Sequence, residues 1–419
     1  MNHRIDERIV VTGLGVVCPA GVGLEAFWLS ILRGTSSIRE KTFFPNAGSR
    51  GRAAGIAQFE PATQFSWSDI PKAEGQDRLF RIAQTAIDEA LAHAGLAGAA
   101  GAGDRADMGL YISSAIGPMA TMEAIVRERL RGDLRDPGIW RTFSFGRIAS
   151  LLASRCDLGG PYAVLPTGCA GGCDALGYGL SAIRSGAVDR AVVGAFEAPV
   201  TPLVEAAFAR INATSSRDCP PKGASCPFDT KRDGFVLGEG GAALILERES
   251  AAMARGARPL GVIAGFGSCC SAFHMTDING AGDAIATSIE LALGDAHLTA
   301  HEIDHVNLHG SSTPMNDVAE ANALRTTMNG ATKTMPVTSL KSQNGHALAA
   351  ANAIELAAAV MTVHEQVIPP TANLTEQDPR VGLAVVSPWP RPAPVRNVLK
   401  TSSGFGGIHS AIVVGRYDA

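Results

Sequence analysis

The sequence predicts an α/β protein in which helices cover β-sheets, and three observations support this prediction. Short β-branched runs such as 9–11 and 191–193 alternate with Ala-rich helical stretches such as 81–92 and 351–363. Apolar residues make up 46% of the chain, charged residues make up 18%, and 47 residues are glycine. This composition is typical of a compact protein with many turns and not of a disordered chain. In addition, short pieces of the first half recur in the second half.

Three such matches occur in the same order in both halves of the chain. The matched pairs are 10–15 with 262–267, 188–194 with 303–309, and 240–246 with 406–414. One match of this kind arises easily by chance because short apolar strands are common, but three in register indicate a duplication. A chain of 419 residues also exceeds one ordinary core. We therefore expect two related halves, 1–250 and 251–419, joined near a short helix that Gly256 closes.

Charge and cysteine content narrow the class of protein. The formal net charge of −4 favours neither nucleic acid nor an anionic membrane as the main ligand. Residues 1–8 carry mixed charge and are followed by no apolar run of secretory or membrane-spanning length, so a cytoplasmic location is expected. The eight cysteines form no CxxC pair, which disfavours both a disulfide framework and a thiolate zinc site.

The first candidate site centres on Cys169. An apolar strand at 162–165 runs into a glycine turn, and a helical pattern then continues through Leu176, Leu180 and Ile183. At such an elbow, free backbone N–H groups and the positive end of the helix are expected to lower the pKa of the Cys169 thiol and make it a nucleophile. A small cysteine packed among glycines explains the local sequence equally well.

Two histidines in glycine turns complete the arrangement. His309 ends a short strand and precedes a turn of small polar residues, which places its imidazole at the edge of a sheet where α/β sites gather. His346 follows Gly345 and precedes a helix from Ala347, whose positive end favours a neutral ring that can donate a hydrogen bond. A lone histidine is usually structural, but two of them with an elbow cysteine form a nucleophilic set.

Two motif matches lack the context that their chemistry requires. Residues 301–305 fit the HExxH zinc motif, which needs a helix to bring both rings to one face, yet this segment runs directly into a strand. Residues 238–243 fit GxGxxA, but a strand follows where a dinucleotide site requires a helix. We therefore expect neither a zinc site nor a nicotinamide site.

Taken together, these elements resemble the β-ketoacyl synthases, the condensing enzymes of fatty-acid and polyketide synthesis. The resemblance covers nearly the whole chain, and its motifs keep their order. The motifs are Val10–Val17, Thr167–Cys169, Pro227–Val236, His309–Asp317, Lys341–His346 and Gly404–Gly407. The resemblance implies the thiolase-like fold, in which two similar halves stack as five layers in the order αβαβα.

The resemblance also implies a reaction of two stages. Cys169 would take an acyl group from a carrier-protein thioester, and a malonyl carrier protein would then enter and lose carbon dioxide. The resulting carbanion would attack the acyl group on the enzyme. His309 and His346 would hydrogen-bond the malonyl thioester carbonyl and so stabilise the enolate. This chemistry requires neither a metal nor a redox cofactor.

Four further residues receive supporting roles from the resemblance. Lys341 would tune the histidine pair electrostatically and would be held by Glu355. The backbone N–H of Phe405 would form the oxyanion hole together with that of the nucleophile, and the Phe405 side chain would gate access to it. Thr313 would support the site.

Several details resemble the α ketosynthase subunits of bacterial type II polyketide synthases more than housekeeping fatty-acid enzymes. They are Gly168, Pro199–Pro202, His274–Thr276 and Ser402–Phe405, where Ser403 replaces an aromatic residue. A housekeeping elongation enzyme would share every catalytic residue, so it remains an alternative. A chain-length-factor subunit is a second alternative, although such subunits lack the nucleophile. A thiolase that uses coenzyme A fits less well, because two histidines resemble the decarboxylating branch.

The expected partners follow from the same resemblance. An acyl carrier protein is acidic, so a basic patch is expected near the mouth of the pocket, with Arg210, Arg217 and Lys222 as candidates. Ordinary solvated charges explain these three residues equally well. A dimer is also implied, either with a second copy of the chain or with a chain-length factor.

Overall fold

The computed structural model describes residues 7–41, 48–58, 77–98, 101–132, 144–328 and 330–418. Over these residues one mixed sheet runs through the molecule in the order β13-β11-β10-β15-β16-β9-β1-β8-β7-β5-β6, with β2 paired to β1. Its strands are β1 (Ile9–Cys18), β2 (Gly21–Val22), β5 (Gly109–Ser113), β6 (Tyr162–Val164), β7 (Arg190–Glu197), β8 (Gly240–Arg248), β9 (Gly261–Cys270), β10 (His305–Asn307), β11 (Pro336–Thr338), β13 (Ala384–Val385), β15 (Asn397–Gly404) and β16 (Ile408–Gly415). Two short pairs lie apart from it: β3 (Arg39–Glu40) with β4 (Ala53–Ala54), and β12 (Val367–Ile368) with β14 (Arg391–Pro392).

The helices alternate with these strands, as the sequence predicted. They are α1 (Leu24–Leu32), α2 (Arg78–His93), α3 (Ala102–Arg105), α4 (Met119–Arg131), α5 (Phe145–Arg155), α6 (Gly171–Arg184), α7 (Pro202–Arg210), α8 (Glu249–Ala254), α9 (Asp283–Asp295), α10 (Asn316–Thr327), α11 (Lys341–Asn344) and α12 (Ala349–Glu365). Within the described residues, none of them is long and apolar enough to cross a membrane.

The large sheet consists of two similar half-sheets that join where β1 pairs with β9. Outward from this junction, one half runs β1, β8, β7, β5, β6 and the other runs β9, β16, β15, β10, β11. In both halves the first two pairings are antiparallel and the next two are parallel. The strand order therefore confirms the internal duplication.

One of the three sequence matches is wrong. The match of β1 with β9 and that of β8 with β16 join equivalent strands, but 188–194 lies in β7 and 303–309 spans β10. By strand order, the counterpart of β7 is β15, and the counterpart of β10 is β5. Strands of a parallel ladder that are buried on both faces all read as short apolar runs, so their residues alone do not distinguish them.

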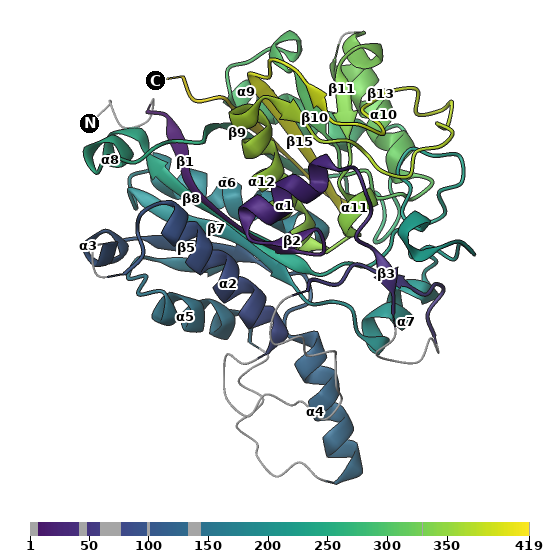
Figure 1. The fold of residues 1–419 in the computed structure, drawn as a ribbon, viewed down its shortest axis with the longest axis horizontal. Coiled ribbons are helices and arrows are strands. Elements are labelled where there is room, and N and C mark those ends of the chain that lie inside the picture. Colours follow the sequence, from purple (N-terminus) through teal and green to yellow (C-terminus); the bar gives the residue numbers. More distant parts are fainter. Residues whose placement is uncertain are drawn as a thin grey trace.

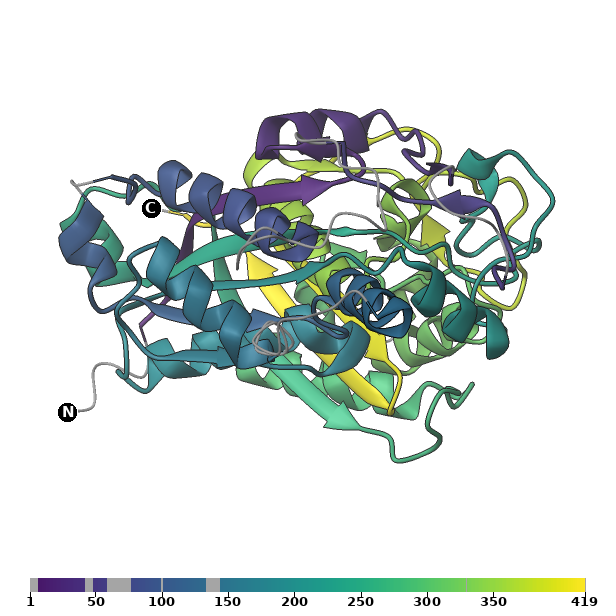
Figure 2. The ribbon, with the colours of Figure 1, turned by 90° about the horizontal axis from the view of Figure 1, so that it is seen from below.

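Helices separate and cover the two half-sheets (Figure 1). Helices α2 and α5 pack on the outer face of the first half-sheet, and α9 and α10 cover the outer face of the second. Figure 2 views the molecule from the side that α2 and α5 cover. Helices α6 and α12 lie between the half-sheets and contact strands of both. These five layers confirm the expected αβαβα fold.

The pattern of apolar residues in α2 and α12 fits the layer in which each helix lies. Helix α2 has an apolar face that includes Leu79, Ala83 and Ile87, and Asp77 caps its first turn by accepting a hydrogen bond from the backbone N–H of Phe80 at 2.9 Å. Helix α12 is instead buried from Ala349 through Val363 and rich in alanine, because sheets or helices surround it on all sides. Small side chains there let the half-sheets approach closely.

The central core is common to both halves of the chain. Val11 and Leu176 from the first half pack in one cluster with Leu356 and Ile412 from the second. The predicted boundary between 250 and 251 falls inside α8, and it stays a prediction about the duplication.

Candidate active site

Cys169 lies at an elbow between β6 and α6, in a single 3₁₀ turn over Gly168–Ala170. The elbow depends on glycine. Gly168 has a φ of +59°, and a Cβ on Gly171 would lie 2.0 Å from the Oγ of Ser113. Because these positions carry no side chain, the start of α6 can press against β5 and α12. The local geometry therefore agrees with the strand-to-helix turn predicted from the sequence.

His346 lies at the matching elbow of the second half, between β11 and α12. Gly345 has a φ of +74°, and the backbone N–H of His346 donates to the carbonyl of Val236 at 2.7 Å. By strand order, β11 corresponds to β6, so Cys169 and His346 occupy equivalent corners of the two halves. Helices α6 and α12, which begin at these corners, pack on each other.

His309 lies two residues after the end of β10, and a buried carboxylate fixes its turn. Glu320 in α10 accepts hydrogen bonds from the backbone N–H groups of His309 and Gly310, both at 2.7 Å. It also accepts from the Thr401 hydroxyl at 2.8 Å and from the Asn316 amide at 2.9 Å. Glu320 was not predicted from the sequence. A glutamate between two alanines on a helix, one turn after Asn316, was the available signal.

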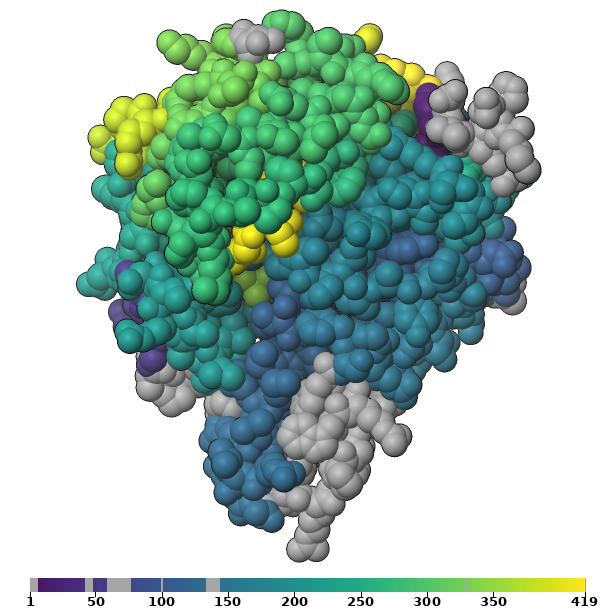
Figure 3. All heavy atoms as spheres, turned by 180° about the vertical axis from the view of Figure 1, so that it is seen from behind, coloured from purple at the N-terminus to yellow at the C-terminus, as the bar shows by residue number. Residues whose placement is uncertain are grey.

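One cavity of about 410 Å³ brings the predicted residues together, with Cys169, His309, His346, Thr313 and Phe405 all in its wall. Lys341 and Glu355 lie behind this wall. In the view from behind, atoms of the C-terminal segment, coloured yellow, surface in a hollow between the green and blue parts of the chain (Figure 3). Phe405, in the loop between β15 and β16, is 37% exposed.

The two imidazoles are buried and neutral. Their ring centroids lie 5.1 Å apart with an interplanar angle of 83°. Burial lowers the pKa of both His309 and His346 well below the usual value, and the positive charge of Lys341 lowers both further. Within the described part of the chain, each Nδ1 is buried without a hydrogen-bond partner, whereas each Nε2 reaches the cavity surface. Both rings can therefore present Nε2–H as a donor.

The expected low pKa of Cys169 is wrong. Burial raises the pKa of this thiol to about 12, and Glu197 raises it further. Lys341 and the backbone N–H of Phe405 act in the opposite direction but do not compensate. The pattern of residues predicted the helix end correctly but not the loss of solvent, which favours the neutral thiol. At neutral pH, Cys169 therefore carries its proton until it reacts.

A buried carboxylate links two buried lysines behind the histidines. Lys341 Nζ donates to Glu355 at 2.7 Å, as expected, and Lys400 Nζ forms an ion pair with the other carboxylate oxygen at 2.7 Å. All three side chains are at most 2% exposed. Burial lowers the pKa of Lys341 in spite of Glu355. Lys400 was not predicted from the sequence, although a lysine that directly follows Val398 and Leu399 was a signal of a paired buried charge.

The three basic candidates do not share one cavity. Arg210 is exposed at the end of α7, next to Ile211 and Asn212, which line the catalytic cavity. Arg217 lies instead in a second cavity of about 530 Å³ and donates to the carbonyl of Gly223 at 3.0 Å. The exposed Lys222 belongs to the neighbouring turn, Pro221–Gly223.

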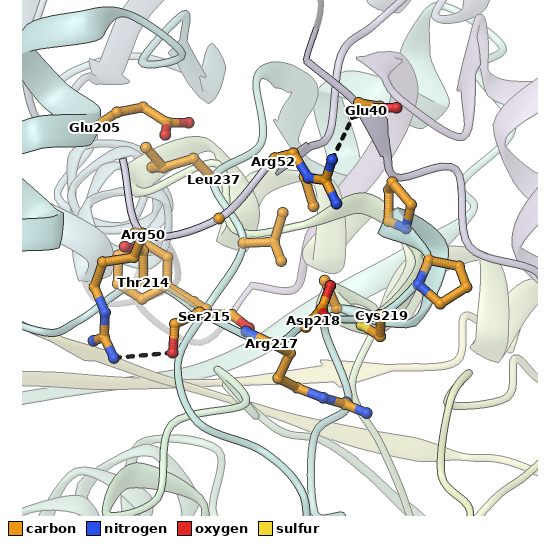
Figure 4. A pocket seen from close by; sticks show the side chains of 18 residues that line it. Glu40, Arg50, Arg52, Glu205, Thr214, Ser215, Arg217, Asp218, Cys219 and Leu237 are labelled. Atoms are coloured by element: carbon orange, nitrogen blue, oxygen red, sulfur yellow. Dashed lines mark hydrogen bonds and ion pairs between the residues drawn. The ribbon is translucent and has the colours of Figure 1, made fainter. Parts of the chain in front are cut away.

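Figure 4 shows this second cavity, with Arg217, Arg50 and Arg52 in its wall together with Glu40 and Asp218. Phe235 lines both cavities and lies between them, with its ring 5.1 Å from that of His346. The expectation of one basic patch at the mouth therefore needs correction. Arg210 and Arg217 are close in sequence, but Arg217 lies in the cavity on the other side of Phe235.

The HExxH segment has no continuous helix. His301 lies in a 3₁₀ turn over Ala300–Glu302, and His305 lies in β10 with Nε2 2.9 Å from the hydroxyl of Thr338. Burial lowers the pKa of His305 to about 3. No group of three or more possible metal ligands occurs within the described ranges of the chain.

The comparison with known families agrees with this geometry. The N-terminal domain of β-ketoacyl synthases matches residues 6–252, and their C-terminal domain matches residues 260–375. The chain belongs to the β-ketoacyl synthase family. The resemblance inferred from the motifs is thereby confirmed, and the protein is an enzyme of the acyltransferase class.

The ketosynthase is similar along its whole length to individual relatives. It is 37% identical over 424 residues to the tetracenomycin polyketide synthase ketoacyl synthase alpha subunit of Streptomyces glaucescens, with 99% of each chain covered. It superposes with a TM-score of 0.90 and 36% identity on a chain of AntDE:AntF, a type II PKS acyl-carrier protein in complex with its ketosynthase bound to the hexaketide; the match covers 98% of this chain and 100% of that one. It also superposes on the ishigamide ketosynthase/chain length factor, with a TM-score of 0.88, 32% identity and the same coverage.

Proposed function

We propose that this ketosynthase forms carbon-carbon bonds in type II polyketide biosynthesis by decarboxylative Claisen condensation. One observation carries the proposal: the wall of a single cavity holds a cysteine and two neutral histidines whose Nε2 atoms face the open space. This set supplies a nucleophile and two convergent donors, which are the groups that the reaction needs.

In the first stage, Cys169 Sγ attacks the carbonyl of an acyl carrier-protein thioester. The backbone N–H groups of Cys169 and Phe405 stabilise the oxyanion that forms, and the second of these already contacts the sulfur. The bond to the carrier-protein sulfur then breaks, and the cysteine proton ends on that leaving sulfur. Because the thiol starts protonated, proton loss accompanies the attack.

In the second stage, a malonyl carrier protein occupies the same cavity. Its carbon–carboxylate bond breaks, carbon dioxide leaves, and the electron pair forms an enolate at the thioester. Nε2–H groups of His309 and His346 donate to the enolate oxygen, and the positive charge of Lys341 favours that anion. The enolate carbon then attacks the acyl group, the bond to Cys169 breaks, and the released thiolate takes a proton from water.

Phe405 controls access to Cys169, and Thr313 positions the arm that carries the thioester. The Phe405 ring lies 6.1 Å from that of Phe208, in a loop whose next two residues, Gly406 and Gly407, have positive φ values. Such a loop can turn the ring away from Cys169 when an acyl chain enters. The Thr313 hydroxyl lies 2.8 Å from that of Ser311 in the cavity wall and can hydrogen-bond the arm that carries the thioester.

An acyl carrier protein is the proposed partner at the cavity mouth. Arg210 supplies positive charge beside it, and Ile211 and Met315 in the cavity wall have exposed apolar side chains. Arg217 lines the second cavity and Lys222 lies in the turn beside it, so both are proposed only as secondary contacts. The ketosynthase of the AntDE:AntF complex binds such a carrier protein.

A second subunit is also part of the proposal. In the described chain the large sheet ends at β6, where Tyr162 is half exposed, and such an edge can pair with another chain. The similarity to a ketosynthase/chain length factor favours a heterodimer with a chain-length-factor-like subunit over a homodimer. All eight cysteines are unpaired, which supports a reducing location such as the cytoplasm.

Intact mass spectrometry tests the function directly. The protein is mixed with carrier proteins that bear acyl chains of several lengths and then with malonyl carrier protein. The mass of the group attached to Cys169 is followed. A type II polyketide enzyme gives repeated additions of an unreduced two-carbon unit. A single elongation of long saturated chains would indicate a housekeeping fatty-acid enzyme instead. Cys169→Ala is the negative control, and it should fold normally but accept no acyl group.

A further inference from the structure

Besides His309, His346 and the exposed His274, one more histidine lines the catalytic cavity, and the proposed mechanism does not use it. His409 in β16 lies directly opposite Ser403 in β15 in the register of the two strands. Its Nδ1 atom is 3.0 Å from the Ser403 hydroxyl. Both side chains are largely buried, yet both lie in the wall of the cavity that contains Cys169.

The hydrogen bonds of this pair leave one donor and one acceptor free. Burial lowers the pKa of His409 to about 4, so the ring is neutral at physiological pH. If the Ser403 hydroxyl donates to Nδ1, the ring presents Nε2–H to the cavity and the serine oxygen can still accept. If Nδ1–H donates instead, the serine O–H is free to donate and Nε2 can accept. The pair therefore presents both functions in either tautomer.

The neighbouring residues leave the His409–Ser403 pair free to bind a group in the cavity. Within the described residues, Nε2 of His409 has no hydrogen-bond partner and is not shielded from the cavity. On the other side of His409 in the sheet, Cys269 donates its thiol to the carbonyl of Ala284 at 3.0 Å and so does not compete. His409 is also near enough to His309 to depress its pKa, which places the pair beside the reacting groups.

We infer that His409 and Ser403 select the acyl chain by hydrogen-bonding an oxygen atom that the chain carries close to its thioester. The inference rests on the proposed function and adds the class of chain that is preferred. Ser403 lies two residues before Phe405, whose N–H contacts the Cys169 sulfur, so the pair meets the first carbons of a bound chain. A 3-oxo or 3-hydroxy group pairs there, whereas a methylene chain covers the free donor and the free acceptor of the pair and leaves both without partners.

The test compares two thioesters that differ in one oxygen atom. Octanoyl and 3-oxooctanoyl carrier proteins are offered separately to the full-length protein, and the initial rate of acylation of Cys169 is measured by intact mass. We expect the wild type to react faster with the 3-oxo chain. His409→Phe replaces the imidazole with a phenyl ring and so removes both nitrogens. This variant should reduce the preference for the 3-oxo chain roughly tenfold. His409→Gln should retain part of it.

A matched control separates the site from the substitution. His364→Phe makes the same change at an exposed position in the last turn of α12, and its preference should equal that of the wild type. If His409→Phe fails to fold, Ser403→Ala provides the second variant and should weaken the preference as well. A wild type without preference, or a preference that survives in the folded variants, overturns the inference while acylation itself still supports the proposed function. If neither thioester acylates the wild type, the proposed function fails and the inference fails with it.

Discussion

The ring of His346 stands nearly perpendicular to that of His309, at 83°, with ring centroids 5.1 Å apart. In this arrangement the two Nε2 atoms reach one cavity from two corners of the fold, one after β10 and one before α12. Two neutral donors that meet in this way suit a single oxygen atom that gains negative charge during the reaction.

Removal of either ring should therefore impair decarboxylation more than acylation. For His309→Ala and His346→Ala, we expect the rate of carbon dioxide release from malonyl carrier protein to fall by about 10² to 10³-fold, as for the loss of an oxyanion donor. Acylation of Cys169 should be retained in part. His364→Ala, at an exposed site, is the control. Unimpaired carbon dioxide release in both variants would exclude the proposed role of these histidines.

The pKa values of the two histidines also predict how the rate depends on pH. Both are lowered, so protonation of either ring begins only well below pH 6.5. We expect the decarboxylation rate to stay level as the pH is lowered through 6.5, without the titration of an ordinary imidazole. Steady-state rates between pH 5.5 and 8 provide the measurement. A midpoint near 6.5 that disappears in His346→Gln would contradict the neutral-ring mechanism.

The protonated state of Cys169 is open to a direct chemical test. Because its pKa is raised to about 12, the rate of iodoacetamide labelling at Cys169 should increase steadily up to pH 9 without a plateau. Cys270 is exposed and would react first, so the experiment uses a Cys270→Ser background. Peptide mass spectrometry reports the site of labelling. A plateau below pH 8 would mean that a thiolate is already present in the resting enzyme.

The buried charges behind the histidines should respond unequally to substitution. Glu355→Gln leaves the buried ammonium groups of Lys341 and Lys400 without their ion-pair partner, which costs about 3 to 5 kcal/mol. Lys400→Met leaves a neutral Lys341–Glu355 pair, and its cost should be lower by about 2 kcal/mol or more. Chemical denaturation of the three proteins measures the difference. An equal loss of unfolding free energy in both variants would show that the Lys341–Glu355 pair itself depends on Lys400.

Glu197 should make stability depend on pH. Burial raises its pKa from 4.5 to about 8, although the backbone N–H of Ala115 and the hydroxyl of Ser114 donate to it. Between these values the folded protein holds a proton that the unfolded chain has lost, so stability falls as the pH rises. The slope contributed by this group approaches about 1.4 kcal/mol per pH unit. Glu197→Gln should remove that slope, which denaturation of both proteins at pH 5 and pH 7 would reveal.

Local patterns were enough to predict the corners of the site. Glycines before Cys169 and His346, and a polar turn after His309, identified each turn because tight turns have their own residue preferences. Lys341 and Glu355 were paired correctly through the resemblance.

Long-range contacts account for what the sequence did not reveal. Glu320 and Thr401 meet although 81 positions separate them, and Lys400 reaches Glu355 from another layer. The direction of the Cys169 pKa shift depends on solvent exclusion, which no short window of residues encodes. Arg217 was placed with Arg210 because the two are close in sequence, although Arg217 lines the second cavity and not the catalytic one.

The equivalent positions of Cys169 and His346 bear on how such an enzyme could arise. An ancestor built from two identical halves would have carried the same side chain at both corners, facing each other across its symmetry axis. With both halves in one chain, each corner can change alone, and here one carries sulfur and the other imidazole. A single half, produced alone, would hold one reactant without its counterpart.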